Sequence, residues 1–245
     1  MLLVMNEFRA AAGHRLASTV QMSADVGTRS IPLRAEFIRR ITCIHQMICV
    51  ILSAMRYEAE HKQRTHKRIV RNAARKFRAK GLNGPAVSEV MKASGLTVGG
   101  FYKHFRSKED LLVAAIEEGL RDSREKFLPV ARAAPKGEGW KEIIKSFLSV
   151  EHCDHPEGGC PMAAMSTEIA RATPAVKNRV GALLREHRDH ILPFMPGDTD
   201  EEKDRKLIVA VTAMNGALAV ARTMTDPKRK QQVLDAVRDH LLNTL

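Results

Sequence analysis

A stretch rich in cysteine and histidine, EHCDHPEGGC, carries the most reactive side chains in this sequence. Its possible zinc ligands are His152, Cys153, His155 and Cys160. Their spacing matches no common zinc motif, so we predict no metal site. Either cysteine could instead sense oxidants or electrophiles, if its thiol pKa were lowered by the start of the following helix. We favour a third interpretation, a loop between helices in which Cys160 packs as a small apolar residue.

The same side chains allow an enzymatic alternative, in which Cys160 is a nucleophile and His152 or His155 is its base. The sequence shows no third group to orient that base, no oxyanion arrangement and no glycine loop that follows a strand. We therefore predict that the chain is not an enzyme, and that it has no catalytic residues and no cofactor.

A second stretch, GLTVGGFYKHF at residues 95–105, places two glycines in the first turn of an expected short helix. Glycine costs roughly 1 kcal/mol per helical position relative to alanine. Gly99 and Gly100 have a use there if the helix backbone must approach another molecule closely. Phe101 and Phe105 are four residues apart, so both should anchor the helix to a small core.

The segments around this stretch predict two further helices and a turn. A helix over residues 58–80, ended by Gly81, has one apolar stripe that consists of Ile69, Val70, Ala73, Ala74 and Phe77. A second helix runs from Pro85 to Gly95, and Ser107 is the expected N-cap of the helix after the stretch. Three short helices with a turn of roughly four residues describe a helix–turn–helix, which places one helix in the DNA major groove.

The segment IVRNAARKFRAKGLNGPAVSEVMKASGLTVGGFYKHFRSKEDLL resembles the DNA-binding domain of the TetR (tetracycline-repressor) family of transcriptional regulators. The likeness is close over residues 66–112 and most specific in FYKHFRSKEDLL. It implies an all-α fold, with an N-terminal three-helix helix–turn–helix domain and a C-terminal helical domain that binds a small ligand and dimerises. Repression of target genes is the family expectation.

The expected DNA-binding residues follow from the resemblance and from the outward face of the short helix. They are Thr97, Val98, Gly99, Gly100, Tyr102, Lys103, His104 and Lys108. Thr97 is expected to cap the helix, and Lys108 lies in a first helical turn, whose amides favour a phosphate. The family often has a polar or basic residue where this chain has Val98. Base readout is therefore expected to use thymine methyls, backbone approach or DNA shape.

The positive charge is concentrated around this module. The net charge is +4 over residues 1–57, +8 over residues 58–110 and zero over residues 111–245. A basic module on a neutral body favours a polyanion, here double-stranded operator DNA. A DNA-architectural protein is the weaker alternative, because the second half is neutral and apolar. We expect DNA binding in residues 58–108 and sensing and dimerisation in residues 109–245.

The second half predicts only helices, and its last two are expected to form a homodimer. A capping box at Thr199 precedes the stretch LIVAVTAMNGALAVA, which is apolar on nearly all sides. Such a helix must be buried on more than one side. The helices near residues 199–224 and 228–244 are therefore expected to pair with those of a second copy in a four-helix bundle.

The effector is expected to be a small, mostly apolar molecule that releases the protein from its operator. Methionine adapts to varied apolar shapes, which favours a pocket among the helices between residues 140 and 224. The candidate ligand-binding residues are Phe147, His152, Cys160, Met162, Met165, Glu168 and Met214.

Residues 1–57 show no sustained periodicity, and Met55 resembles a natural start. We expect a disordered extension or a mispredicted start, with residues 1–54 dispensable. The apolar run at residues 41–54 is short for a membrane span, and its basic flank is unusually long for a signal peptide. Four scattered cysteines make no disulfide framework, so we expect a cytoplasmic protein without a membrane partner.

Overall fold

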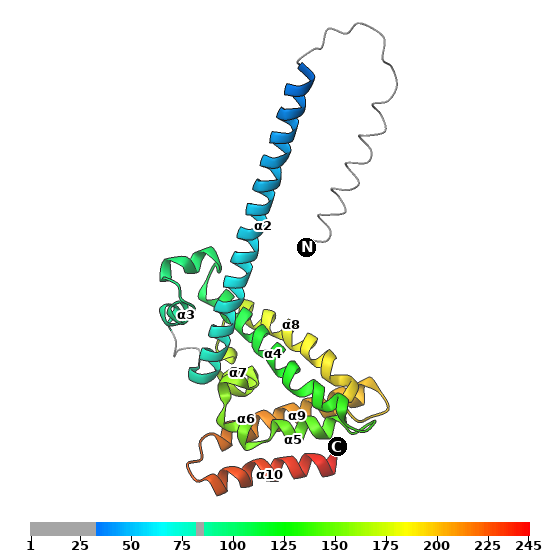
Figure 1. The fold of residues 1–245 in the computed structure, drawn as a ribbon. Coiled ribbons are helices and arrows are strands. Elements are labelled where there is room, and N and C mark those ends of the chain that lie inside the picture. Colours follow the sequence, from blue (N-terminus) through cyan, green and yellow to red (C-terminus); the bar gives the residue numbers. More distant parts are fainter. Residues whose placement is uncertain (1–32, 82–85) are drawn as a thin grey trace. The chain divides into compact units, whose positions relative to one another are not determined.

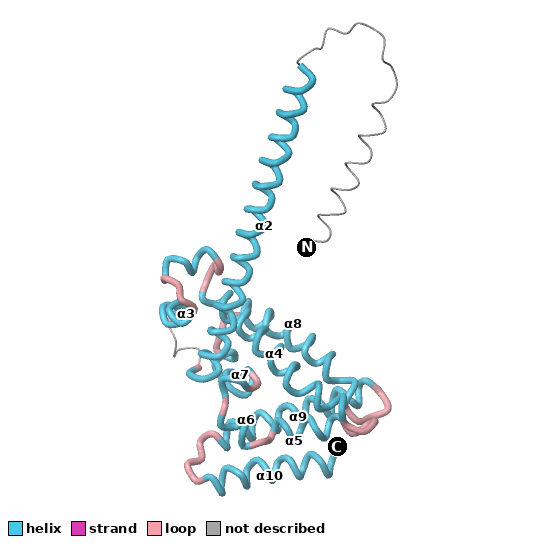
Figure 2. The backbone as a smooth tube through the Cα atoms, in the orientation of Figure 1, coloured by secondary structure: helices cyan, strands magenta, loops and turns pink. Residues whose placement is uncertain are grey.

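The computed structural model describes residues 33–81 and 86–245, and all regular elements in these ranges are helices (Figures 1 and 2). They are α2 (Leu33–Lys80), α3 (Val87–Ala93), the 3-10 helix η1 (Val98–Lys103), α4 (Lys108–Ala133), α5 (Gly139–Phe147), α6 (Val150–Asp154), the 3-10 helix η2 (Pro156–Gly158), α7 (Pro161–Ala170), α8 (Pro174–Ile191), the 3-10 helix η3 (Leu192–Phe194), α9 (Asp200–Ala221) and α10 (Pro227–Thr244). The predicted all-α fold class is confirmed. The chain divides into two units, with the boundary after Tyr57.

The first unit differs from the predicted disordered extension, because residues 33–57 are helical and belong to α2. No glycine or proline interrupts residues 33–80, so the backbone can remain helical over the whole length. Gly81 ends the helix with a φ of 73°. The remaining residues of that prediction, 1–32, lie outside the described part. No helix in the described part is both long enough and apolar enough to span a membrane.

The three-helix module at the start of the second unit packs as the sequence predicts. Phe101 and Phe105 are both buried, and their rings stack with centroids 5.5 Å apart. They join a core that also includes Ile69, Phe77 and Met91. These contacts confirm that the two phenylalanines anchor the segment between α3 and α4.

The boundaries of this module carry the expected stop and start signals. Gly95 has a φ of 67°, where α3 ends, and the Ser107 hydroxyl accepts a hydrogen bond of 3.1 Å from the Asp110 amide. From there α4 continues through Pro129 to Ala133. Residues 139–154 form two helices, α5 and α6, because Ser149 caps α6 separately.

Helices α4 to α10 form the rest of the second unit. In Figure 1, α8 lies alongside α4, and α10 lies against α9 and α5. Their core is a second cluster of buried side chains, which includes Phe127, Trp140, Phe147, Met214 and Leu234. The side chains of α4 near the module pack on the first cluster, and those near Phe127 pack on the second. One continuous helix therefore connects both cores.

His152 is fully buried and holds the loop between α6 and α7. Its Nε2 accepts a hydrogen bond of 3.2 Å from the Cys160 amide, so the ring proton is on Nδ1, which donates to the Phe147 carbonyl at 2.7 Å. Burial is the main cause that lowers the pKa of His152 to about 4, and the nearby Lys126 and Arg222 add to it. Arg222 joins the helices on either side of this loop, because it donates to the carbonyls of His152 and Cys153 in α6 and of Ala163 in α7.

Arg78, near the end of α2, joins the module to the rest of the unit. Its buried guanidinium donates to the Glu157 carbonyl and to the Asp122 carboxylate, both at 2.8 Å. Gly119 on α4 makes room for this group. A Cβ at Gly119 would lie 2.6 Å from Arg78 Nη1 and 3.3 Å from Pro161 Cγ.

We expect Gly119→Ala to lower the free energy of unfolding by about 1–3 kcal/mol, because the added methyl displaces a buried guanidinium from both of its partners. Urea denaturation measures this change. Gly181→Ala on α8 is the matched control, since its Cβ would make only an ordinary contact of 3.7 Å with Arg185. This control should be neutral or up to about 1 kcal/mol more stable. Equal stability of Gly119→Ala and the wild type would contradict the fixed position of Arg78.

We also expect acid to destabilise the protein through His152. The folded-state pKa lies below the unfolded value of about 6.5, so the unfolded chain binds more protons between these values. The stability that the neutral ring contributes is therefore present above pH 6.5 and is lost as the pH falls towards 4. Between pH 7 and pH 5 the loss should be about 2 kcal/mol.

Denaturant titrations at both pH values test this expectation. His152→Gln should have a shallower pH dependence than the wild type. His155→Gln, which changes an exposed histidine three residues away, should keep the wild-type dependence. Parallel curves for all three proteins would rule out His152 as the source.

Candidate nucleic-acid interface and effector cavity

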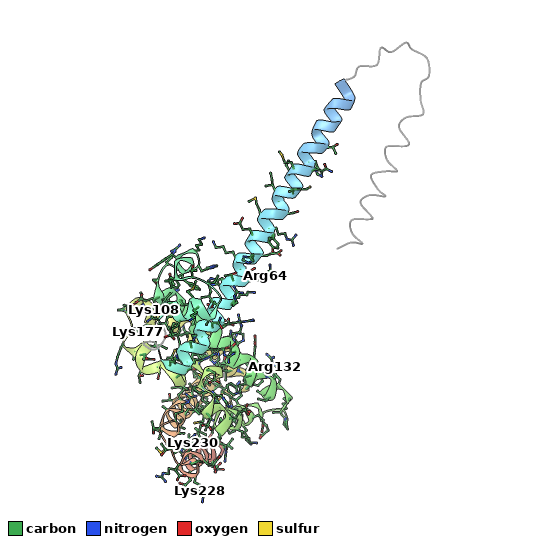
Figure 3. The ribbon with its side chains drawn as sticks, turned by 60° about the vertical axis from the view of Figure 1, so that its left-hand side comes forward. Arg64, Lys108, Arg132, Lys177, Lys228 and Lys230 are labelled. Carbon is green, nitrogen blue, oxygen red and sulfur yellow. The ribbon has the colours of Figure 1, made fainter. Side chains whose placement is uncertain are left out.

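The predicted DNA-binding residues lie together on η1 and the first turn of α4. Most of them are exposed, and Val98 and Tyr102 are 51% and 77% exposed. Two details differ from the sequence prediction. The segment is a 3-10 helix, and Thr97 occupies its N-cap position without a capping hydrogen bond from its side chain. Figure 3 shows Lys108 at the opposite end of this unit from Lys228.

Packing does not require the two glycines of η1. A Cβ at Gly99 would meet no atom within 4 Å, and one at Gly100 would lie 3.6 Å from Met91 Cε, an ordinary contact. Neither glycine has a positive φ, in contrast to Gly95. The fold itself would accept side chains at both positions. Neither packing nor backbone conformation therefore explains the glycine pair.

His104 is less accessible to DNA than the sequence predicts. It is half-buried, its ring centroid lies 6.1 Å from that of His66, and its Nδ1 is buried without a partner in the described part of the chain. Burial is the main cause that lowers its pKa, and the neighbouring His66, Lys62 and Lys103 contribute. His104 therefore faces outward only in part and stays neutral, whereas Lys103 is exposed.

A row of arginines on α2 was missed by the sequence analysis. An open groove beside α2 is lined by Arg64, Lys67, Arg68, Arg71, Asn72, Arg75 and Asp122. The four arginines recur every three or four residues, a spacing that places them on one helical face. This spacing is the sequence signal that identifies them, whereas the apolar stripe of the same helix indicates only its buried face. One of them, Arg71, is neutralised in part by Glu118 at 3.2 Å.

Behind the module, an internal cavity of about 70 Å³ lies among α4, α5, α7, α8 and α9. Most of its lining is apolar, including Trp140 and Ile144. The structure places four of the predicted ligand-binding residues there: Phe147, Cys160, Met162 and Met214. Thus residues from α5, α9 and α7 with its N-cap, chosen from sequence, lie around one space.

The other three predicted ligand-binding residues lie elsewhere. Both ring nitrogens of His152 form hydrogen bonds with backbone groups. Met165 is buried in the core of the DNA-binding module, and Glu168 lies beside Gly81 at the end of α2. The reason is their position along α7, because Met165 and Glu168 lie one and two helical turns beyond Met162 and do not line the cavity.

The polar side chains of the cavity were not predicted. They are Ser123, Arg124, His187 and Asn215. The pKa of His187 is lowered to about 4, mainly by burial, with contributions from Arg124 and His190. The Nδ1 of His187 and the Oδ1 of Asn215 are buried and have no hydrogen-bond partner within the described residues. No sequence signal distinguished His187, because it lies among charged residues in an ordinary amphipathic helix.

The cysteine–histidine loop has none of the reactive arrangements considered above. Burial raises the pKa of both Cys153 and Cys160, which opposes the thiolate that a thiol sensor needs. The bond between Cys160 and His152 uses the backbone amide and not the thiol, so it is no nucleophile–base pair. His155 lies at the surface, 3.4 Å from Glu157. Among the residues with described side chains, no cluster of His, Cys, Asp or Glu could hold a metal.

Comparison with known proteins identifies relatives of the helix–turn–helix segment. The family model for bacterial regulatory proteins of the tetR family matches residues 69–115. The HTH-type transcriptional regulator YerO of Bacillus subtilis is 31% identical over 88 residues, which cover 36% of this chain and 30% of YerO. The aligned segment thus spans less than a third of that relative.

Solved structures cover more of the chain. A TetR transcriptional regulator from Chloroflexus aurantiacus is 28% identical, with a TM-score of 0.61 over 75% of this chain and 95% of that one. A TetR-family regulator from Cytophaga hutchinsonii shares the fold at 19% identity, with a TM-score of 0.61 over 75% and 96%. AibR, solved with isovaleryl coenzyme A and operator DNA, shares it at 16% identity, with a TM-score of 0.51 over 72% and 97%. The family match shows that residues 69–115 form a helix–turn–helix segment of the tetR family of regulatory proteins, and the helical domain behind it shares the fold of TetR transcriptional regulators.

Proposed function

We propose that this protein is a dimeric one-component regulator, in which a small, mostly apolar effector releases operator DNA. Residues 58–108 bind DNA, and residues 109–245 sense the effector and dimerise. The observation that carries this proposal is the glycine pair of η1, Gly99 and Gly100. The fold does not need these glycines, yet they lie on an exposed surface beside Lys103 and Lys108.

The chemistry of this surface suits the DNA major groove. Val98 and Tyr102 offer apolar contact to thymine methyls, and the glycines allow the backbone to approach base edges. Lys108 begins α4, where the free amides of the first turn and the ammonium group can bind the same phosphate. Phosphate contacts position the protein on DNA, and the exposed surface of η1 around Gly99 and Gly100 determines which base sequence it prefers.

The path from the cavity to DNA runs through the loop between α6 and α7. Cys160 and Met162 line the cavity, and Glu157 in the same loop accepts a hydrogen bond from Arg78 of α2. Ligand pockets typically measure about 300–1,000 Å³, so an effector must displace the wall of this smaller cavity. Displacement of the loop then alters the Arg78 contacts and the orientation of the DNA-binding module. AibR, a protein of the same fold, was solved with both a small ligand and operator DNA.

Dimerisation is assigned to α9. One face of this helix is buried within the protomer, and the opposite face exposes Ile208, Val209 and Val220. Ile208 and Val209 are 59% and 52% exposed. The apolar stripe of α10 packs inside the protomer, with Leu234 and Leu241 buried, so α10 contributes less to the proposed interface than the sequence analysis expected. A second copy that pairs along α9 would cover its apolar face.

We expect Lys108→Ala to weaken binding to all DNA sequences similarly, because a phosphate contact is lost, and to lower the salt slope by about one. Gly99→Leu should abolish or change sequence preference without loss of stability, since its side chain meets open space in the free protein. Selection from a random duplex library provides the operator, and fluorescence anisotropy at several salt concentrations measures the affinity.

Lys228→Ala is the matched control, since it removes an exposed lysine at the far end of the unit (Figure 3). It should leave both affinity and salt slope unchanged. Wild-type operator binding by Lys108→Ala and Gly99→Leu together would refute the assigned interface.

We expect Ile208→Asp to convert the dimer into folded monomers, because it places charge in the centre of the proposed apolar contact. Ala236→Asp introduces the same charge on the exposed, polar face of α10 and should leave the dimer intact. Light scattering coupled to size exclusion measures the mass, and circular dichroism checks the fold. A monomeric wild type, or a dimer that survives Ile208→Asp, would contradict the assignment to α9.

A further inference from the structure

We propose that the effector is a neutral molecule with an apolar body of about the size of one aromatic ring and a single hydroxyl group, which hydrogen-bonds to Asn215 and His187. This inference rests on the proposed function only in treating the internal cavity as the effector site. It adds the chemical class of the ligand, which neither the fold nor the comparisons specify.

The lining of the cavity favours an uncharged ligand. Phe127, Trp140, Ile144 and Phe147 surround it, so a charged group would lose its hydration without adequate compensation. The one fully charged side chain in the lining is Arg124, whose guanidinium lies 3.7 Å from the Glu186 carboxylate. Arg124 is thus already partly neutralised, and carboxylate or phosphate ligands gain little from it.

Two orphaned polar atoms specify the hydrogen bonds. The Oδ1 of Asn215 and the Nδ1 of His187 are both buried without partners in the described chain, and both residues line the cavity. A buried polar group without a partner destabilises the folded state, so the ligand-free protein retains these atoms at a cost. A ligand that satisfies them removes that cost.

The acceptor character of Asn215 Oδ1 narrows the choice of ligand group. A ketone, an ether or an ionised acid has no proton to donate to it. A hydroxyl can donate its single proton to Asn215 Oδ1 and can accept a hydrogen bond from His187 when the neutral ring carries its proton on Nδ1. Burial keeps that ring uncharged at neutral pH. A hydroxyl therefore fits both orphaned atoms with one functional group.

The size limit comes from the volume of the cavity. A cavity of about 150 Å³ accommodates benzene, and this one measures about 70 Å³. Met162, Met195 and Met214 are in its wall, and flexible thioether side chains can shift to admit one ring. Larger fused rings or long acyl chains would require the helices themselves to separate.

Isothermal titration calorimetry on the full chain without DNA tests the proposal with phenol, toluene and benzoate as probes. Phenol should bind about tenfold or more tightly than either of the others, which corresponds to one satisfied buried hydrogen bond. Asn215→Leu and His187→Phe should each reduce this preference while keeping toluene affinity. Asn215→Leu should also raise the melting temperature of the ligand-free protein.

Met214→Leu changes the cavity wall without changing its polar groups, so it serves as the matched control and should keep the preference for phenol. Equal binding of phenol and toluene, tighter binding of benzoate, no binding of phenol, or an unchanged preference in both polar variants would each overturn the inference.

An operator-binding assay separates this inference from the proposed function. If phenol binds with the expected selectivity but leaves operator affinity unchanged, the ligand class stands and effector-controlled release is wrong. If phenol does not bind while another compound class releases the operator, the ligand class is wrong and the regulatory function stands.

Discussion

The buried guanidinium of Arg78 is the interaction on which the arrangement of the second unit depends. It comes from the helix that supports the DNA-binding module, and it reaches a carboxylate on α4 and a backbone carbonyl in the loop between α6 and α7. A charge removed from water is stable only while its partners stay in place. Any movement of the loop or of α4 therefore changes the hydrogen bonds of Arg78 on α2. This contact requires a glycine at position 119, because a Cβ there would lie 2.6 Å from Arg78 Nη1.

Neutral histidines serve two different purposes in the same domain. His152 is saturated by backbone groups and keeps the loop in one conformation, whereas His187 retains an unused nitrogen at the cavity. Burial lowers the pKa of both rings for the same reason. The difference in their hydrogen bonding, and not in their ionisation, separates a structural residue from a candidate ligand contact.

The DNA-binding module could be predicted from sequence because its signals are local. Capping by Ser107, the stop at Gly95 and the spacing of Phe101 and Phe105 all act within a few residues. The cavity depends on contacts between helices far apart in sequence. Apolar character was enough to identify Phe147 and Met214 as candidates, but nothing local indicates whether a residue of α7 faces the cavity or α2.

For the same reason, His187 and Asn215 could not have been identified from sequence. Their distinguishing property is the absence of a hydrogen-bond partner, and this property appears only once the helices are packed. The helix over residues 33–57 shows the opposite error. The absence of apolar periodicity predicts disorder there, whereas the run of residues without glycine or proline permits the helix that the structure has.

The open space around Gly99 has a consequence for how such a regulator can diverge. In most folded segments a new side chain affects packing, so changes in recognition and losses of stability occur together. On η1 the two are separated, because the core contacts come from Phe101 and Phe105 and a side chain at Gly99 would meet only solvent or the bound partner. A gene duplicate of this protein could acquire a new binding preference by substitution at this position while its folding remained unchanged.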